Sequence, residues 1–409
     1  MDNFPELIRI RQVFNTERIE DITAHIEAQC AEWDHLFGPD ESIALAIGSR
    51  GISNMALMAK TIVSHFKARG NRIIIVPAMG SHGGATAEGQ REVLEGYGVT
   101  EEYTGAEIRS SMEVVELNSE GLENRVFVDK NAYSCDSIIV INRIKAHTDF
   151  TSEIESGLLK MCTIGLGKQM QALEIHSRGI YGLKELIRPT AERTIREARV
   201  KLGFAIVENS YHETQILQAL TPDKFYEEEK KLLELAKSNI AQLPVKNLDI
   251  LCVDEMGKNI SGVGIDPNVI GDIGIRNEEP KNDVKIKNII VNDITAESHG
   301  NAIGVGLADI ITEQVRGKID YPATNENTIT SSFLERAKTP MVAATYEEAL
   351  RIALLVTGKA ADEVRLVRIK NTQDLSEVYV SHSVFRDIEK SPNVEKIGSF
   401  VQWEEMTSL

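Results

Sequence analysis

The sequence has few cysteines, and their spacing is typical of neither a metal site nor a disulfide framework. Its 409 residues contain four cysteines, which are scattered and form no CxxC pair. Disulfide scaffolds and zinc knuckles need closely spaced pairs, whereas isolated thiols are typical of the reducing cytosol. We therefore expect a cytoplasmic protein.

Long apolar runs are also missing. No stretch approaches the roughly 18 consecutive apolar residues of a membrane-spanning helix. The N-terminal segment MDNFPELIRIRQVF lacks the charged-then-apolar order of a signal peptide. The sequence therefore predicts no membrane segment.

Positive charge is scarce relative to negative charge. The chain has 45 Lys and Arg against 62 Asp and Glu, a formal net charge of −17. Nucleic acids and anionic membranes bind basic surfaces, so neither is expected as a partner. A small anionic substrate is not excluded, because it responds only to the local charge.

What the sequence does contain is an alternation of strand and helix patterns. The apolar runs IALAI and RIIIV each precede a Gly-containing loop, SIIVI is a further apolar run, and amphipathic helices follow several of these runs. This alternation predicts an α/β fold with mostly parallel sheets flanked by helices. The chain is too long for one ordinary core, so we expect two domains.

The domain boundary is placed near residue 245. The charged helix pattern KFYEEEKKLLELAKSNIAQLP is interpreted as a solvated connector, and a new strand series begins after it. We predict an N-terminal α/β domain over 1–245, possibly with 393–409, and a C-terminal α/β domain over 246–392. In open parallel sheets, ligands bind at the carboxyl ends of the strands, and we expect the active site in the cleft between the domains.

Two histidines follow strands of the first domain. His82 lies in PAMGSHGG, directly after RIIIV, and His147 lies in VINRIKAHTDF. Either one alone could be a structural histidine. Two in the same kind of loop are an acid–base pair candidate, because imidazole exchanges protons at neutral pH.

Four further residues are candidates. Lys160 has apolar neighbours in SGLLKMC, so it is either a lysine that reaches solvent or one that is used chemically. His176 follows it at a predicted helix end. Arg50 in GSRG and Lys258 in MGKN are loop cations, which are either surface charges or clamps for a carboxylate.

This ordered set of motifs resembles the lactate racemase family. The matching order is strand–GSHGG–helix, strand–KAH, and SGLLK followed by a histidine. The resemblance implies a racemase or epimerase of a 2-hydroxy acid that depends on a nickel-pincer nucleotide. It also implies enzymes that build this cofactor as partners, together with the small-molecule substrate.

The resemblance assigns a role to each candidate. His82 and His147 would be the proton-transfer residues, Lys160 would carry the cofactor through a thioamide, and His176 would be the protein ligand of nickel. Arg50 and Lys258 would bind the substrate. Lys168 is a second candidate for the tether. In the implied reaction, hydride leaves C2 as the hydroxyl proton leaves, and hydride then returns to either face of the keto acid.

Other functions fit parts of the pattern. A metal-dependent hydrolase could use His82, His147 and His176, although no HxH or HExxH pair places two ligands on one element. A non-catalytic protein that binds a nucleotide or a metal cofactor is a second alternative. A Rossmann dehydrogenase is disfavoured, because the first strand–helix turn has no GxGxxG.

Overall fold

The computed structural model describes residues 4–49 and 51–409, and this part of the chain forms two compact units. One unit is Asn15–Asn239. The other joins the described residues up to Phe14 to Ile240–Leu409. Each unit has its own sheet and core and is described by itself.

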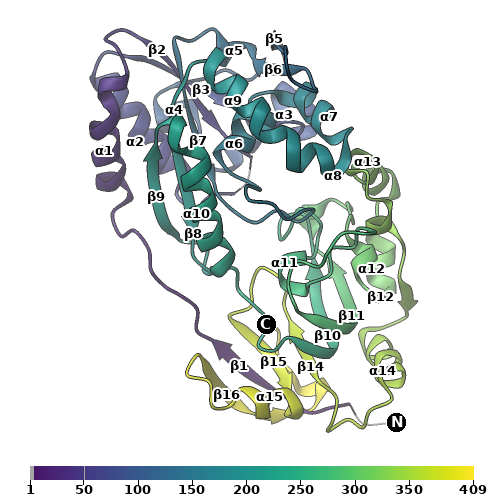
Figure 1. The fold of residues 1–409 in the computed structure, drawn as a ribbon. Coiled ribbons are helices and arrows are strands. Elements are labelled where there is room, and N and C mark those ends of the chain that lie inside the picture. The colour runs from purple at the N-terminus through teal and green to yellow at the C-terminus, as the bar shows by residue number, and fades with distance from the viewer. Residues whose placement is uncertain (1–3, 50) are drawn as a thin grey trace. The chain divides into compact units, whose positions relative to one another are not determined.

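The unit Asn15–Asn239 is built on a six-stranded sheet in the order β4-β3-β2-β7-β8-β9 (Figure 1). All neighbouring pairs are parallel except β8 and β9. The strands are β2 (Ser42–Ile47), β3 (Arg72–Pro77), β4 (Glu107–Ile108), β7 (Ser137–Arg143), β8 (Val200–Glu208) and β9 (Thr214–Leu220). A separate antiparallel pair is formed by β5 (Val114–Leu117) and β6 (Val126–Asp129).

Alternating residues of the central strands enter two different cores. Ala44 and Val140 lie in one apolar cluster, whereas Leu45 and Ile139 lie in the other. Strands that are apolar on both faces are typical of a parallel sheet covered on both sides by helices. The predicted α/β class is therefore confirmed, and the strands expected from IALAI, RIIIV and SIIVI are present.

Helices cover each face of this sheet (Figure 1). One face packs against α1 (Ile22–Trp33), α2 (Met55–Ala68) and Leu94 of α3 (Ala87–Gly96). The other face packs against α6 (Leu158–Lys160), α7 (Lys168–His176), α9 (Ile187–Glu197) and α10 (Phe225–Ser238). The remaining short helices are α4 (Glu101–Thr104), α5 (Lys130–Tyr133) and α8 (Gly179–Tyr181).

The second unit is built on an eight-stranded sheet in the order β13-β12-β11-β10-β14-β15-β1-β16. The five strands from β13 to β14 are mutually parallel, and the other three add antiparallel. The strands are β1 (Leu7–Gln12), β10 (Asn247–Met256), β11 (Lys285–Ile294), β12 (Ile310–Thr312), β13 (Met341–Ala343), β14 (Leu366–Ile369), β15 (Glu377–Ser381) and β16 (Val394–Val401). Its helices are α11 (Pro267–Ile270), α12 (Glu313–Lys318), α13 (Tyr321–Ser331), α14 (Tyr346–Thr357) and α15 (His382–Ile388).

The ends of the chain lie in the second unit, and this corrects the expected domain limits. β1 pairs with both β15 and β16, so its Leu7 lies opposite Ser381 on one side and Val401 on the other. The segment 393–409 therefore does not join the first domain, and the residues before Asn15 do not belong to it either. The reason is hydrogen bonding: β1 bridges the last two strands of the chain.

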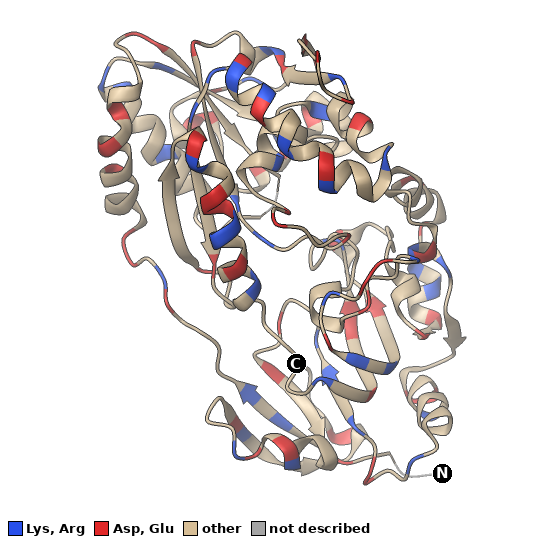
Figure 2. Cartoon of the chain, in the orientation of Figure 1, with Lys and Arg blue, Asp and Glu red and all other residues tan. Residues whose placement is uncertain are grey.

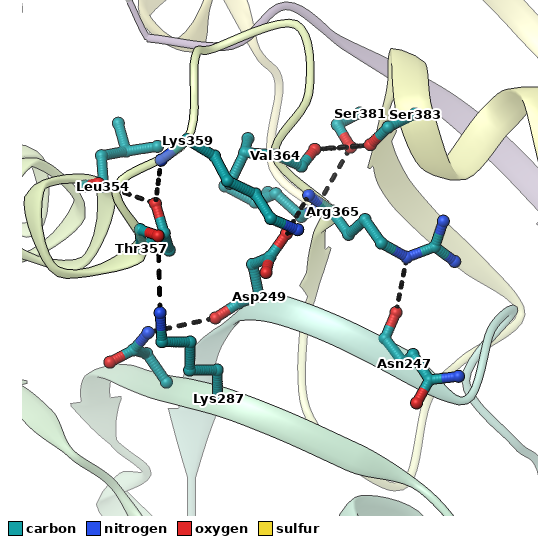
Figure 3. A network of polar contacts seen from close by, with 12 residues as sticks. Asn247, Asp249, Lys287, Leu354, Thr357, Lys359, Val364, Arg365, Ser381 and Ser383 are labelled. Carbon is teal, nitrogen blue, oxygen red and sulfur yellow. Dashed lines mark hydrogen bonds and ion pairs between the residues drawn. The ribbon is translucent and has the colours of Figure 1, made fainter.

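A polar network lies at the amino ends of β10 and β14 in this unit (Figure 3). The carboxylate of Asp249 accepts hydrogen bonds from Lys359 Nζ at 2.7 Å and from the backbone N–H of Arg365 at 2.9 Å. Arg365 donates in turn to the carbonyl of Asn247 at 2.8 Å. The network ties the segment after α14 to the sheet, at the edge opposite to the carboxyl ends of these strands.

Within residues 4–49 and 51–409, no helix is both long enough and apolar enough to cross a bilayer.

Candidate functional site

The loops that carry the predicted histidines begin at the same edge of the six-stranded sheet. Ile47 of β2 lies opposite Pro77 of β3 on one side and Ile141 of β7 on the other. Because these strands are parallel, the loops that follow them start side by side. This edge is the candidate site.

The loop after β3 presents His82 on a tight turn. The backbone N–H of His82 donates to the carbonyl of Met79 at 3.1 Å. Gly83 has a φ of +63°, and a Cβ there would lie 2.6 Å from the backbone nitrogen of Gln90. Only glycine fits this approach to the start of α3, so the turn is fixed against the helix.

Ser49, in the loop after β2, contacts the imidazole of His82. Its hydroxyl is hydrogen-bonded to Nδ1 of His82, and its carbonyl accepts from the hydroxyl of Tyr97. A partner at one ring nitrogen sets the orientation of an imidazole. Sequence analysis missed Ser49, although its place at a strand end next to Arg50 was a usable signal.

His147 is held by backbone and side-chain contacts within its own loop. Glu155, which is 2 % exposed, accepts from the backbone N–H of His147 at 2.6 Å. The backbone N–H of Asp149 donates to Nδ1 of His147 at 3.1 Å, and the ring of Phe150 lies 4.6 Å from the imidazole. Because Nδ1 accepts, the neutral ring carries its proton on Nε2.

The segment that carries Lys160 is packed against the same edge. Asn142, in β7, donates to the carbonyl of Gly157 at 3.0 Å. Gly48, after β2, leaves room for this contact, because a Cβ there would lie 3.0 Å from Asn142 Oδ1 and 3.5 Å from Met161 Cε.

A second hydrogen bond joins this segment to the loop of His82. The helix widens into a π-type turn over Met161–Gly165, and π turns are frequent at functional sites. At its end, the carbonyl of Gly165 accepts from the backbone N–H of Gly80 at 3.2 Å. The loops of β2 and β3, strand β7 and the Lys160 segment are therefore directly connected.

His176 is the last residue of α7, as the sequence predicted. The pKa of its imidazole is lowered to about 4, first by burial and then by the ammonium of Lys160, whereas the carboxylate of Asp149 opposes the shift. The charges of Lys160 and of the His147 loop thus act on this ring. A neutral imidazole keeps a lone pair for a metal ion at neutral pH.

Glu229 is a buried acid that the sequence interpretation placed wrongly. It lies on α10, expected to be a solvated connector, but it is 1 % exposed and accepts from the backbone N–H of Leu159 at 3.1 Å. Burial raises its pKa to about 7. The spacing of Phe225, Glu229 and Leu232 on one apolar face of the helix was a usable signal.

Lys168, the second candidate for the tether, is a structural lysine. Its side chain is fully buried and donates to the carbonyl of Pro77 and to Gln90 Oε1, the latter at 2.9 Å. Its ammonium also forms an ion pair with Asp129 at 3.1 Å. Lys160 is partly exposed and is the better-placed lysine for a covalent bond.

The two predicted substrate residues have different outcomes. Arg50 lies outside the described residues. Lys258 follows β10 in the second unit, where its Nζ donates to the carbonyl of Gly262 at 2.6 Å and to Asn327 Oδ1 at 2.9 Å. Its backbone N–H donates to Ser298 Oγ at 2.9 Å.

The donor set suits a metal held mainly by a cofactor. Among the residues that the structure describes, no group of three or more His, Cys, Asp or Glu side chains is arranged to hold a metal ion. His176 can supply one neutral imidazole, and the partly exposed Lys160 acts on it electrostatically. One neutral imidazole beside a partly exposed lysine suits a metal whose other ligands come from a bound cofactor.

Comparison with known proteins points to one family. Residues 7–180 match the family model described as the lactate racemase N-terminal domain. This range includes every predicted site residue except Lys258. No curated protein matches the chain in sequence.

A solved structure agrees with this family. The fold resembles that of the lactate racemase apoprotein from Thermoanaerobacterium thermosaccharolyticum, with 14% sequence identity and a TM-score of 0.52. The alignment covers 90% of this chain and 98% of the other. The resemblance to the lactate racemase family is therefore confirmed, and the chain has the lactate racemase fold. Together the two findings support an isomerase of the racemase or epimerase type.

Proposed function

We propose that this protein is a racemase or epimerase of a 2-hydroxy acid and that it uses a nickel-pincer nucleotide bound covalently to Lys160. The observation that carries the proposal is the set of contacts at one sheet edge. Ser49 contacts His82, Gly80 binds Gly165, and Asn142 binds Gly157. These contacts gather the two histidine loops and the lysine segment, as one catalytic centre requires.

The histidines act as the acid–base pair in this proposal. One imidazole accepts the hydroxyl proton of the substrate while hydride leaves C2, and the other serves the opposite enantiomer. The backbone N–H of Asp149, which donates to Nδ1 of His147, fixes the orientation of that ring. Each such group contributes about 10²–10⁴ in rate.

Lys160 and His176 would hold the cofactor. When bound, the nickel-pincer nucleotide supplies an electrophilic ring that takes up hydride and gives it back. Lys160 would form the thioamide, and His176 would provide a neutral imidazole for the nickel. Arg50 and Lys258 would bind the substrate carboxylate.

The test is to produce the protein together with the enzymes that build the cofactor. Intact-mass analysis is expected to show an adduct in the wild type and in Lys130→Ala, an exposed control, and none in Lys160→Ala. His176→Ala is expected to lose nickel. A panel of chiral 2-hydroxy acids then measures racemisation or epimerisation directly.

The acid–base assignment has its own readout. His82→Ala and His147→Ala are expected to keep the adduct and the nickel but to lose at least about 10²-fold in kcat. Unchanged turnover in both variants would contradict the assignment. An adduct that persists in Lys160→Ala would move the tether to another lysine.

A non-catalytic cofactor-binding protein is the second candidate function. It would show the adduct and the nickel but would convert no hydroxy acid. The metal-dependent hydrolase is less well supported, because His82, His147 and His176 belong to no metal-binding group among the described residues.

A further inference from the structure

A buried chain of three polar side chains runs behind the candidate site. Lys168, Gln90 and Asp129 are each 0% exposed. Lys168 Nζ donates to Gln90 Oε1 at 2.9 Å and forms an ion pair with Asp129 at 3.1 Å. These residues come from α7, α3 and the end of β6, so their side-chain contacts join three elements that are far apart in sequence.

Gln90 extends this chain to the loop of His82. Its amide Nε2 donates to the carbonyl of Gly80 at 2.9 Å and to the carbonyl of His82 at 3.2 Å. One amide group therefore holds both ends of the turn that presents the imidazole. Its oxygen is occupied by Lys168 at the same time, which fixes the orientation of the amide.

Lys168 connects the same chain to the helix of His176. It is the first residue of α7, and its φ of +55° lies in the left-handed region, which is costly for a residue other than glycine. α7 is also anchored by Gln171, whose Oε1 accepts from the backbone N–H of Phe127 at 2.8 Å. The start of α7 is thus fixed by side chains.

Burying the charges of Lys168 and Asp129 costs free energy. Desolvation lowers the pKa of Lys168 and raises the pKa of Asp129, and the attraction between the two opposes both shifts. Apolar side chains of similar volume often stabilise a fold at least as well as a buried ion pair. Stability alone therefore does not account for these three residues, whereas a need to fix geometry does.

We propose that Gln90 and Lys168 are positioning residues that fix the His82 loop relative to the helix that ends at His176. The catalytic consequence rests on the proposed function, because it assumes that His82 transfers protons and that His176 binds nickel. The structural part does not depend on it. A displacement of about 1 Å at a catalytic group can cost about 10²-fold in rate.

Two substitutions of Gln90 test the proposal. Gln90→Met removes all three hydrogen bonds of the amide with little change in volume. Gln90→Glu, when ionised, keeps an acceptor for Lys168 but has no hydrogen for the carbonyls of Gly80 and His82. Thr190→Val is the matched control, because Thr190 is also 0% exposed and its hydroxyl is hydrogen-bonded to Asn124.

The first readout needs no cofactor. Hydrogen exchange of the cofactor-free protein is expected to speed up at residues 79–86 in both Gln90 variants, while β2 and β7 stay protected. Thr190→Val is expected to leave 79–86 unchanged. If 79–86 exchanges as in the wild type in both Gln90 variants, the proposal is overturned.

The second readout uses the loaded enzyme. Gln90→Met and Gln90→Glu are expected to lower kcat by about 10²-fold with little change in KM, and to keep the adduct on Lys160. An equal loss in Thr190→Val would show a general effect of destabilisation and would also overturn the proposal. If the wild type converts no hydroxy acid, the proposed function fails, and the exchange experiment still decides the positioning role.

Discussion

At the scale of single residues, Ser49 is the side chain that contacts the imidazole of His82. The serine hydroxyl lies at Nδ1 of the imidazole, and Tyr97 holds the serine backbone. A partner at Nδ1 sets which nitrogen carries the proton and how the ring is turned. Ser49 therefore belongs to the acid–base machinery of the proposed reaction.

Ser49→Ala is expected to lower kcat/KM by about tenfold, which corresponds to about 1.4 kcal/mol and is the usual size of one hydrogen bond. It should also shift the pH dependence of kcat/KM, because the imidazole loses a partner. The measurement is a pH–rate profile of the wild type, Ser49→Ala and Ser81→Ala. Ser81→Ala, at the neighbouring position of the same turn as His82, is the control, and an identical profile for Ser49→Ala and Ser81→Ala would contradict the role.

At this scale the sequence points to the proposed catalytic and cofactor-binding residues more readily than to the residues that hold them. His82, His147, Lys160 and His176 stand out because they occur in short motifs after strands. Glu155 and Gln90 do not stand out, since their partners lie on other turns or other elements and only the folded backbone brings them together. Hydrogen-bond partners of this kind carry no local pattern.

At the scale of elements, α10 is a support for two parts of the site. Lysines and acids alternate along its exposed side (Figure 2), which explains its interpretation as a solvated helix. Its inner side contacts the segment around Lys160 through Glu229. Lys237, near its end, forms an ion pair at 3.2 Å with Glu155, which holds the His147 loop.

Glu229 makes stability depend on pH. Its pKa is about 7 in the folded protein against an ordinary value of 4.5, so the folded chain keeps a proton that the unfolded chain has released between these two values. Stability therefore falls as the pH rises from about 4.5 to 7 and levels off above. The full effect is about 3 kcal/mol at most.

Glu229→Gln removes this dependence, because glutamine does not ionise and still accepts from the backbone N–H of Leu159. In urea unfolding, the free energy of unfolding of Glu229→Gln relative to that of the wild type is expected to be higher at pH 8 than at pH 5. Glu227→Gln, an exposed change on the same helix, should show no such gain. A constant difference between Glu229→Gln and wild type from pH 5 to pH 8 would contradict the assignment.

At the scale of the whole molecule, the strand β1 decides how the chain is divided. Leu7, Ile8 and Ile10 are fully buried between β15 and β16. The sequence shows an apolar strand pattern there, but nothing local tells which sheet it joins. The expected limits of the domains were therefore wrong at both ends of the chain, although the strands expected from IALAI, RIIIV and SIIVI are present.

Ile10→Ala is expected to destabilise the unit that contains Ile240–Leu409 by about 2–5 kcal/mol, the usual cost of truncating a buried isoleucine. Hydrogen exchange should increase in β15 and β16 and stay unchanged in β2, β3 and β7. Val13→Ala, which shortens an exposed side chain just past the strand, is the control. Increased exchange in β3 at the same level as in β15 would show that the two units do not respond separately.

The pairing of β1 also has a consequence for biosynthesis. β1 precedes the whole six-stranded sheet in the chain, whereas both of its neighbours, β15 and β16, follow that sheet. The nascent chain must therefore keep an apolar strand unpaired while the sheet that bears His82, which is complete by Leu220, has already been made. Until β15 and β16 have been made, Leu7, Ile8 and Ile10 have no sheet in which to be buried.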